Sequence, residues 1–280
     1  MNSFMNNHYL SAVNIDLNSK EADQKITDTH CIFHLKHPVK SPSNSHIIIG
    51  LSSFNIPYSW YIFRDGINNS FSIETYNGTT YEIQNIIIEP GNYTSSSLIQ
   101  HLNTKFTSIK SLLNLSKLSI TENRQQQTFY LTTSIIQTCR IFNIKCHKEM
   151  GFYDDKEVIY ENLTTLLFPF RYNLSGSPTI YFRLMNLAIT NRNSKNVDGI
   201  LCNIPCEYMA GSYIYYNPSD IHYFKTYSSV STIEVQILDE EMIPIGNLST
   251  NSPFRFTLSC HFSYNKSVIL ENNDINLEKK

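Results

Sequence analysis

The chain has 280 residues, 41% of them hydrophobic and only 16% charged, with a formal net charge of −2. This length allows a sizeable core, and we expect one main domain. With 18 tyrosines, 16 phenylalanines and only nine glycines, the composition favours half-buried β-strands over helices. The low fraction of charged residues excludes the basic surface that binding to nucleic acids or anionic lipids needs. We therefore expect protein partners and no direct sequence-specific nucleic acid contact.

The two ends of the chain are the least structured parts of the pattern. Residues 1–26 are polar and without clear period, which predicts an N-terminal arm, and residues 266–280 are predicted to form a flexible C-terminal tail. The start lacks a signal-peptide pattern, and no run approaches the roughly 18 apolar residues of a membrane span, so we expect no membrane anchor. The six cysteines have no CxxC pair, which favours free thiols over a disulfide framework.

Period-two patterns begin after the arm. In HCIFHLKH, Cys31, Phe33 and Leu35 share one face, which predicts a strand. SHIIIGLSSF predicts a second strand, and NIPYSWYIF a third that enters after a bend at its proline. FSIETY and TTYEIQNIII then predict a hairpin, with a type I′ turn at Asn77-Gly78.

A single helix interrupts the strands in IIIEPGNYTSSSLIQHLNTKF, residues 86–106. Pro90-Gly91 ends the preceding strand, and residues 94–97 offer side-chain oxygens to a helix start. Leu98, Leu102 and Phe106 recur at helical spacing, which predicts about three turns with one apolar stripe on a sheet. A hairpin follows at KLSITENRQQQTFYLTT, whereas residues 140–176 are irregular, with one short helix near HKEMGF, and are the candidate for a small insertion.

The last hundred residues return to strands, at SPTIYFRLMNLAIT, GILCNIPCEY and, more weakly, HYFKTYSS. In STIEVQILDEE, Ile233, Val235 and Ile237 face one way. In PFRFTLSCHF the inward positions are Phe254, Phe256, Leu258, Cys260 and Phe262. Many antiparallel strands without βαβ alternation predict an all-β fold, a single jelly-roll sandwich over residues 27–265 with one or two short helices.

Three histidines and two cysteines invite a metal interpretation. On a strand rising about 3.3 Å per residue, His30 and His34 lie roughly 13 Å apart, and His37 belongs to the opposite face. Zinc–nitrogen bonds of about 2.0 Å exclude one ion shared by these residues. Cys202 and Cys206 are four apart with no second pair of matching spacing, so we expect buried free thiols.

Acidic runs and catalytic motifs are equally weak signals. Asp239, Glu240 and Glu241, like Asp154 and Asp155, lack the alternating ligand spacing of a calcium loop, so solvated turns are the simpler interpretation. The chain has no GxSxG elbow, no HExxH and no glycine-rich phosphate loop. We therefore expect no catalytic, cofactor-binding or metal residues, no cofactor and no enzyme, and a cupin-like enzyme would require clustered ligands that the strand geometry opposes.

The order of these segments resembles the minor capsid, or penton, proteins of virophages and Polinton-type (Maverick-like) double-stranded DNA viruses. The resemblance is carried by LSSFNIPYSWYIF, by TYNGTTYEIQNIIIEPGNYTSSSLIQHLN, by GILCNIPCEYMAGSYIYY, and by STIEVQILDEEMIPI followed by PFRFTLSCHF. It covers roughly residues 28–265, and its most specific stretch is residues 86–103.

The resemblance implies a structural role in a virion, assembled inside the host cell. It implies an upright single jelly roll, of which five copies close an icosahedral vertex as a homopentamer beside the major capsid protein of the same virus. A five-fold ring needs two different complementary side surfaces on each subunit. The alternative from another class is a viral attachment or carbohydrate-binding jelly-roll module, which would need polar and aromatic side chains converging in a pocket.

Overall fold

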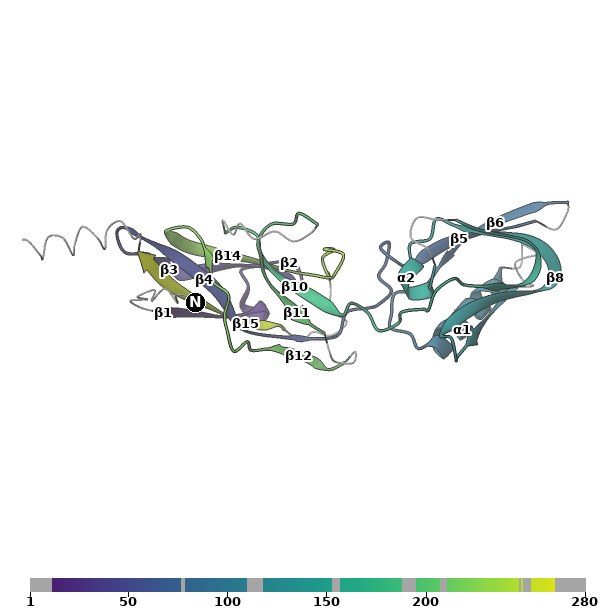
Figure 1. The fold of residues 1–280 in the computed structure, drawn as a ribbon. Helices are drawn as coiled ribbons and strands as arrows, with labels where there is room; N and C mark the ends of the chain where they lie inside the picture. Colours follow the sequence, from purple (N-terminus) through teal and green to yellow (C-terminus); the bar gives the residue numbers. More distant parts are fainter. Residues whose placement is uncertain are drawn as a thin grey trace, which may run out of the picture. The chain divides into compact units, whose positions relative to one another are not determined.

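The chain forms two compact units in a computed structural model that describes residues 12–76, 79–109, 118–152, 157–187, 195–206, 211–246, 248 and 253–264. The jelly-roll unit holds the described residues up to Trp60 and from Ser177 onward, and the insert unit runs from Tyr61 to Gly176. Figure 1 shows the strands of each unit. No helix among these described ranges is long and apolar enough to cross a membrane.

Two five-stranded antiparallel sheets make up the jelly-roll unit. The first has the order β1-β15-β4-β12, with β13 also on β4, and consists of β1 (Ala12–Asn18), β15 (Arg255–Tyr264), β4 (Ser45–Pro57), β12 (Tyr213–Tyr216) and β13 (Phe224–Lys225). The second has the order β11-β10-β14-β3-β2 and consists of β11 (Ile200–Pro205), β10 (Thr179–Leu184), β14 (Ser229–Leu238), β3 (His30–Lys40) and β2 (Gln24–Thr27). This connectivity is that of a jelly roll.

The predicted alternation places aromatic side chains between the two sheets. Phe254, Phe256, Leu258, Cys260 and Phe262 are all buried, as are Ile233, Val235 and Ile237 on β14. Ring contacts tie the sheets together, for example between Phe256 and Phe33 at 5.7 Å and between Phe256 and Phe182 at 5.1 Å. Such pairs add to the free energy gained by burying the rings, and the predicted inward faces of these strands are confirmed.

The described residues of the insert unit form one five-stranded antiparallel sheet and two helices. The sheet has the order β6-β5-β8-β7, with β9 also on β8, and consists of β5 (Ser70–Tyr76), β6 (Tyr81–Ile87), β7 (Leu118–Asn123), β8 (Thr128–Phe142) and β9 (Val158–Leu167). Its helices are α1 (Ser95–Ser108) and α2 (His147–Met150), and a separate apolar core fills the unit.

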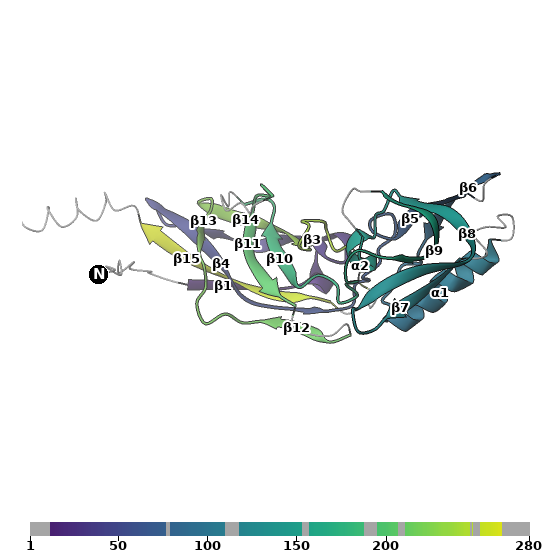
Figure 2. The same ribbon diagram turned by 45° about the vertical axis from the view of Figure 1, so that its right-hand side comes forward.

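Helix α1 begins where the sequence predicts. The Thr94 side chain accepts a hydrogen bond from the Ser97 backbone N–H, and the Ser97 side chain accepts one from the Thr94 backbone N–H. Two backbone donors at the start of the helix are thereby satisfied. Leu98, Leu102 and Phe106 are fully buried, and Figure 2 shows α1 alongside β7. At the preceding corner, the Gly91 backbone is hydrogen-bonded to Phe63 in both directions.

Two predictions on domain organisation are corrected by the structure. The insertion is not confined to residues 140–176 but begins at Tyr61, and the sheet that α1 covers belongs to the insert unit. NIPYSWYIF is not a separate strand, because β4 ends at Pro57 and the chain passes to the insert unit after Trp60. A strand of either unit shows the same period of two, so the alternation could not assign it to a sheet.

The prediction of an unstructured arm over residues 1–26 is wrong for residues 12–26. Residues 12–18 form β1, which pairs with β15 from Ala12↔His261 to Asn18↔Arg255, a 3-10 helix follows at Ser19–Glu21, and Gln24–Thr27 forms β2. The polar composition of β1 reflects a strand with one exposed face. Residues 1–11, the tail from 266 to 280 and the turn at Asn77-Gly78 lie outside the described residues, although β5 and β6 pair as a hairpin.

Candidate functional site

The histidines considered for a metal site have separate partners. His30 Nε2 lies 2.9 Å from Glu234 Oε1, and His34 Nδ1 lies 3.2 Å from Thr232 Oγ1, while His37 is exposed at the far end of β3. No group of three or more histidine, cysteine or acidic side chains in the described ranges could hold a metal ion. The structure therefore does not bring these three histidines together.

The other residues weighed from sequence have structural surroundings. Burial raises the pKa of both the Cys202 and the Cys206 thiol to about 12, so neither is a thiolate at neutral pH. Asp239 is buried, and its Oδ1 accepts a 2.9 Å hydrogen bond from the Ile243 backbone N–H, which closes the turn after β14. Asp154 and Asp155 lie outside the described residues.

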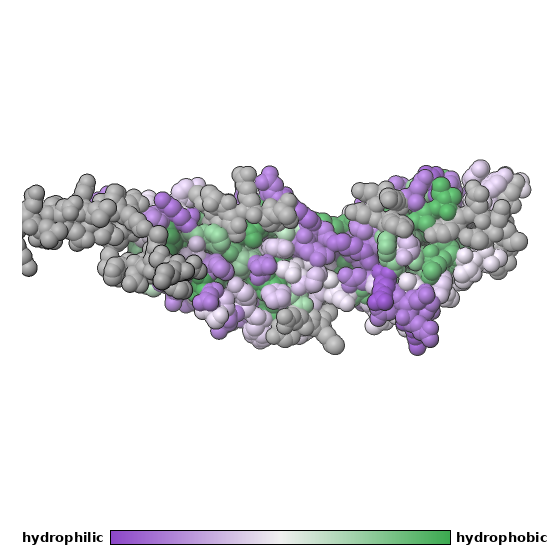
Figure 3. Space-filling model, viewed as in Figure 1, coloured by the Kyte–Doolittle hydropathy of each residue, from purple (hydrophilic) through white to green (hydrophobic). Residues whose placement is uncertain are grey.

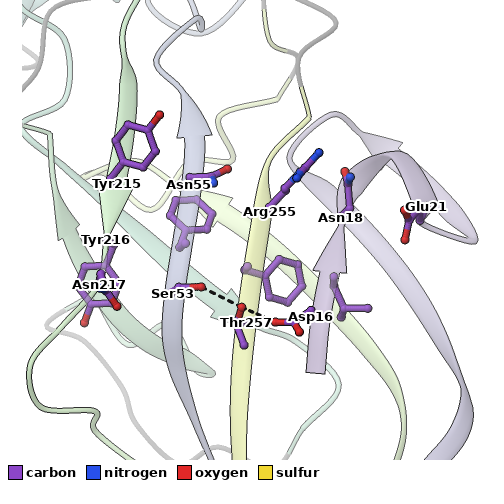
Figure 4. A pocket seen from close by; sticks show the side chains of 13 residues that line it. Asp16, Asn18, Glu21, Ser53, Asn55, Tyr215, Tyr216, Asn217, Arg255 and Thr257 are labelled. Atoms are coloured by element: carbon purple, nitrogen blue, oxygen red, sulfur yellow. Dashed lines mark hydrogen bonds between the residues drawn. The ribbon is translucent and has the colours of Figure 1, made fainter. Parts of the chain in front are cut away.

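A hollow of about 650 Å³ lies on the outer face of the β1-β15-β4-β12 sheet, and we call it the Arg255 hollow. Its main row crosses the sheet through direct cross-strand partners, Asn18 on β1, Arg255 on β15, Asn55 on β4 and Tyr215 on β12. Figure 4 shows these four side chains on neighbouring strands. The alternation that buries Phe254 and Phe256 places Arg255 on this outer face.

A second row in the hollow is hydrogen-bonded within itself. Ser53 Oγ donates to Thr257 Oγ1 at 2.9 Å, and Thr257 Oγ1 donates to Asp16 Oδ1 at 2.6 Å. Arg255, in contrast, has no carboxylate within ion-pair distance among the residues that the structure describes. Its guanidinium therefore keeps its donors available at an exposed position.

The second candidate surface is the outer face of β6, β5, β8 and β9 in the insert unit, which we call the Arg140 face. Arg140 Nη2 lies 2.6 Å from Glu157 Oε2 and its Nη1 lies 3.5 Å from Glu74 Oε2. The hydrogen bond to Glu157, supported by Glu74, raises the pKa of Arg140. The guanidinium carbon also lies 4.6 Å from the ring centroid of Phe142, so a cation–π contact adds to the stabilisation from the two carboxylates.

Apolar side chains border the Arg140 face. On the edge strand β6, Tyr81 is 68% exposed, Ile83 57% and Ile87 50%, and on β9 across the sheet Ile159 is 53% exposed. Figure 3 shows hydrophobic side chains at the surface of this unit, over β5 and β6. Tyr81 stacks on Tyr76 with ring centroids 4.4 Å apart. An edge strand with exposed apolar groups is an unusual feature for an unpartnered surface.

Neither surface is visible in the sequence, because the rows of both join residues that are distant in the chain. Asn18 and Arg255 lie at opposite ends of the sequence, and Arg140 reaches both Glu74 and Glu157. The one local signal was the alternation in TTYEIQNIII, in which Tyr81, Ile83 and Ile87 fall on the face opposite Glu82 and Gln84.

The comparisons with known proteins identify the fold. No protein-family model matches the sequence, and no curated protein matches it. The structure is similar to the crystal structure of the mavirus penton protein, with a TM-score of 0.51 and 11% sequence identity over 90% of this chain and 99% of that chain. A chain of the Sputnik virophage cryo-EM structure is 13% identical over 92% of this chain and 98% of that chain, with a TM-score of 0.45. The first similarity confirms the penton-like jelly-roll fold expected from the sequence.

Proposed function

We propose that this chain is a structural, non-enzymatic protein of a viral capsid, a penton protein that forms homopentamers at the icosahedral vertices beside the major capsid protein. The observation that carries the proposal is the whole-chain structural similarity to the mavirus penton protein, which covers 99% of that chain and therefore includes both units. A jelly roll alone serves many functions. A structural similarity that extends over most of both chains favours the penton function.

The Arg140 face supports an assembly role. Its apolar border, Tyr81, Ile83, Ile87 and Ile159, lies beside an arginine that is already ion-paired with Glu74 and Glu157. Protein interfaces are rich in aromatic side chains and poor in unpaired charges at their centre. We infer that this face contacts a neighbouring copy in the pentamer, where it meets a different surface because a closed five-fold ring uses heterologous contacts.

Single contacts in such a ring are expected to be modest. Each association loses translational and rotational freedom, and neighbouring major capsid subunits offset that loss by holding five copies close together. We therefore expect monomers or pentamers in solution and pentamers in the particle, with the jelly-roll strands running roughly along the five-fold axis.

The decisive experiment is electron microscopy of a virion that contains this chain. We expect density for five copies at each vertex and none elsewhere in the shell. Mass measurement of the purified protein provides a second readout. A map that places the chain away from the vertices, or a stable two-fold dimer in solution, would contradict the proposal.

A further inference from the structure

We propose that the Arg255 hollow is a binding site for a neutral oligosaccharide. The row Asn18, Arg255, Asn55 and Tyr215 offers two planar amides, one planar guanidinium and one aromatic ring on a single sheet face. An asparagine amide, with a donor and an acceptor side by side, and a guanidinium, with paired donors, both suit the adjacent hydroxyl groups of a sugar ring. A tyrosine ring supplies the flat apolar surface on which a sugar ring can stack.

The spacing of the row fits a short chain of sugars. Neighbouring strands lie about 4.8 Å apart, which is close to the length of one sugar unit in a chain. The four cross-strand partners can therefore each contact a successive sugar ring. Tyr215 is 65% exposed at one end of the row, and its ring lies 6.0 Å from the ring of Tyr213, centroid to centroid. Backbone pairing of four antiparallel strands fixes these positions, and a rigid sheet limits the entropy lost on binding.

The groups that line the hollow also have free hydrogen-bonding capacity. Arg255 and Asn55 make no side-chain hydrogen bond with any residue that the structure describes, and Tyr215 makes none either. Asp16 accepts one hydrogen bond from Thr257, which leaves its remaining lone pairs available. A ligand rich in hydroxyl groups can therefore bond to this surface without breaking existing contacts.

The charge and apolar content of the hollow favour a neutral sugar over a protein segment or an acidic group. Its lining includes two carboxylates, Asp16 and Glu21, beside the single guanidinium of Arg255, so an anion would gain little net attraction. The exposed side chains are polar apart from tyrosine, without the aliphatic centre that marks a protein interface. The Arg140 face has that aliphatic border, and the Arg255 hollow does not.

Saturation-transfer NMR on the purified full chain tests the proposal without any capsid, so its result is independent of the proposed penton role. The probes are maltotriose, cellotriose and triacetylchitotriose, each titrated into the millimolar range. We expect saturation transfer to at least one of them. Tyr215→Ala and Arg255→Ala should each weaken that binding by at least about tenfold while circular dichroism shows the same fold.

Tyr227→Ala is the matched control, because Tyr227 is 55% exposed in the same unit but does not line the hollow. We expect this variant to bind as the unaltered chain does. An equal loss in Tyr227→Ala would mean non-specific stacking on tyrosine and would overturn the proposal. So would the absence of transfer to all three sugars, or complete displacement of the sugar by acetate, which would identify a carboxylate site instead.

Discussion

Arg140 and Arg255 occupy comparable positions on the outer faces of two antiparallel sheets, but their neighbours differ. Arg140 lies between the carboxylates of Glu74 and Glu157, whereas the cross-strand neighbours of Arg255 are the amides of Asn18 and Asn55. The guanidinium of Arg140 is engaged by two carboxylates, and the exposed side chains beside it are isoleucines and a tyrosine. An unpaired guanidinium among amides remains available for hydrogen bonds.

The outer faces of the two units therefore suit two kinds of partner. Aliphatic and aromatic side chains around an arginine that is already ion-paired favour another protein subunit. Planar polar groups beside the exposed ring of Tyr215 favour a small hydroxyl-rich ligand. The same period-two pattern produces both faces, and only the residue types at the outward positions distinguish them.

The largest expected effect on stability comes from introducing a charge on the buried side of β15. Phe256 is 2% exposed and packs against Phe33 and Phe182, so Phe256→Asp places a charge in the core and should cost more than about 4 kcal/mol of unfolding free energy. We expect no folded protein by circular dichroism and size-exclusion chromatography.

Its matched control is the adjacent outward position. Arg255→Asp should leave the melting temperature within about 2 °C of the unaltered chain, because surface substitutions rarely change stability by much. Equal melting temperatures for Phe256→Asp and Arg255→Asp would show that the register of β15 is wrong and that Arg255 does not face the hollow.

A second substitution tests whether the Arg140 face is an assembly surface. Ile83→Asp introduces an unpaired charge into its apolar border, and we expect at least about a tenfold loss of pentamer in particles or in native mass spectrometry, without a change in fold. Ile26→Asp is the matched control, since Ile26 is 58% exposed and Ile83 57%, but Ile26 lies on β2 of the jelly-roll unit.

The pair of variants can also reverse the assignment. If Ile26→Asp abolishes the pentamer and Ile83→Asp does not, the subunit contact lies on the jelly-roll unit. The Arg140 face would then have some other partner, and the division of roles between the two units would no longer hold.

A third measurement concerns the ion pairs themselves. Arg140→Ala leaves Glu74 and Glu157 without their shared partner, and we expect the insert unit to melt lower by on the order of 3 °C. Arg255→Ala removes no ion pair, and the melting temperature of the jelly-roll unit should change by less than about 1 °C. Raising the salt concentration should reduce the difference in melting temperature between Arg140→Ala and the unaltered chain, because salt screens exposed ion pairs. A difference that salt leaves unchanged would show that Arg140 stabilises by packing on Phe142.

Features that depend on residues close together in the sequence were predictable, and features that depend on distant segments were not. The cap at Thr94 and the buried stripe of α1 are local, so the sequence alone predicted them. Inward and outward positions on β14 and β15 were likewise predictable from their period. The start of the insert unit at Tyr61 was not, because a strand pattern carries no information about which sheet it joins. Nor were the two arginine surroundings, which depend on cross-strand register between distant segments.

The smallest effect expected is a dependence of the insert unit on pH through Glu149. This glutamate lies on α2, its carboxylate accepts a hydrogen bond from the Asn68 side-chain amide, and burial raises its pKa above the ordinary 4.5. The folded state therefore holds the Glu149 proton more tightly than the unfolded chain does. The stabilisation from that bound proton is fully present below pH 4.5 and is lost as the pH rises through the folded-state pKa.

Glu149→Gln removes this titration, keeps the size of the side chain and keeps an oxygen that can accept the Asn68 hydrogen bond. Thermal unfolding of both proteins between about pH 4 and about pH 8 provides the measurement. We expect similar melting temperatures at the acidic end, because Glu149 is protonated and neutral there. The variant should become the more stable of the two by on the order of 1–2 °C toward neutral pH, where the buried carboxylate is charged. An advantage of the variant that shrinks as the pH rises would mean that Asn68 and the start of α2 stabilise the charged form of Glu149 more than burial opposes it.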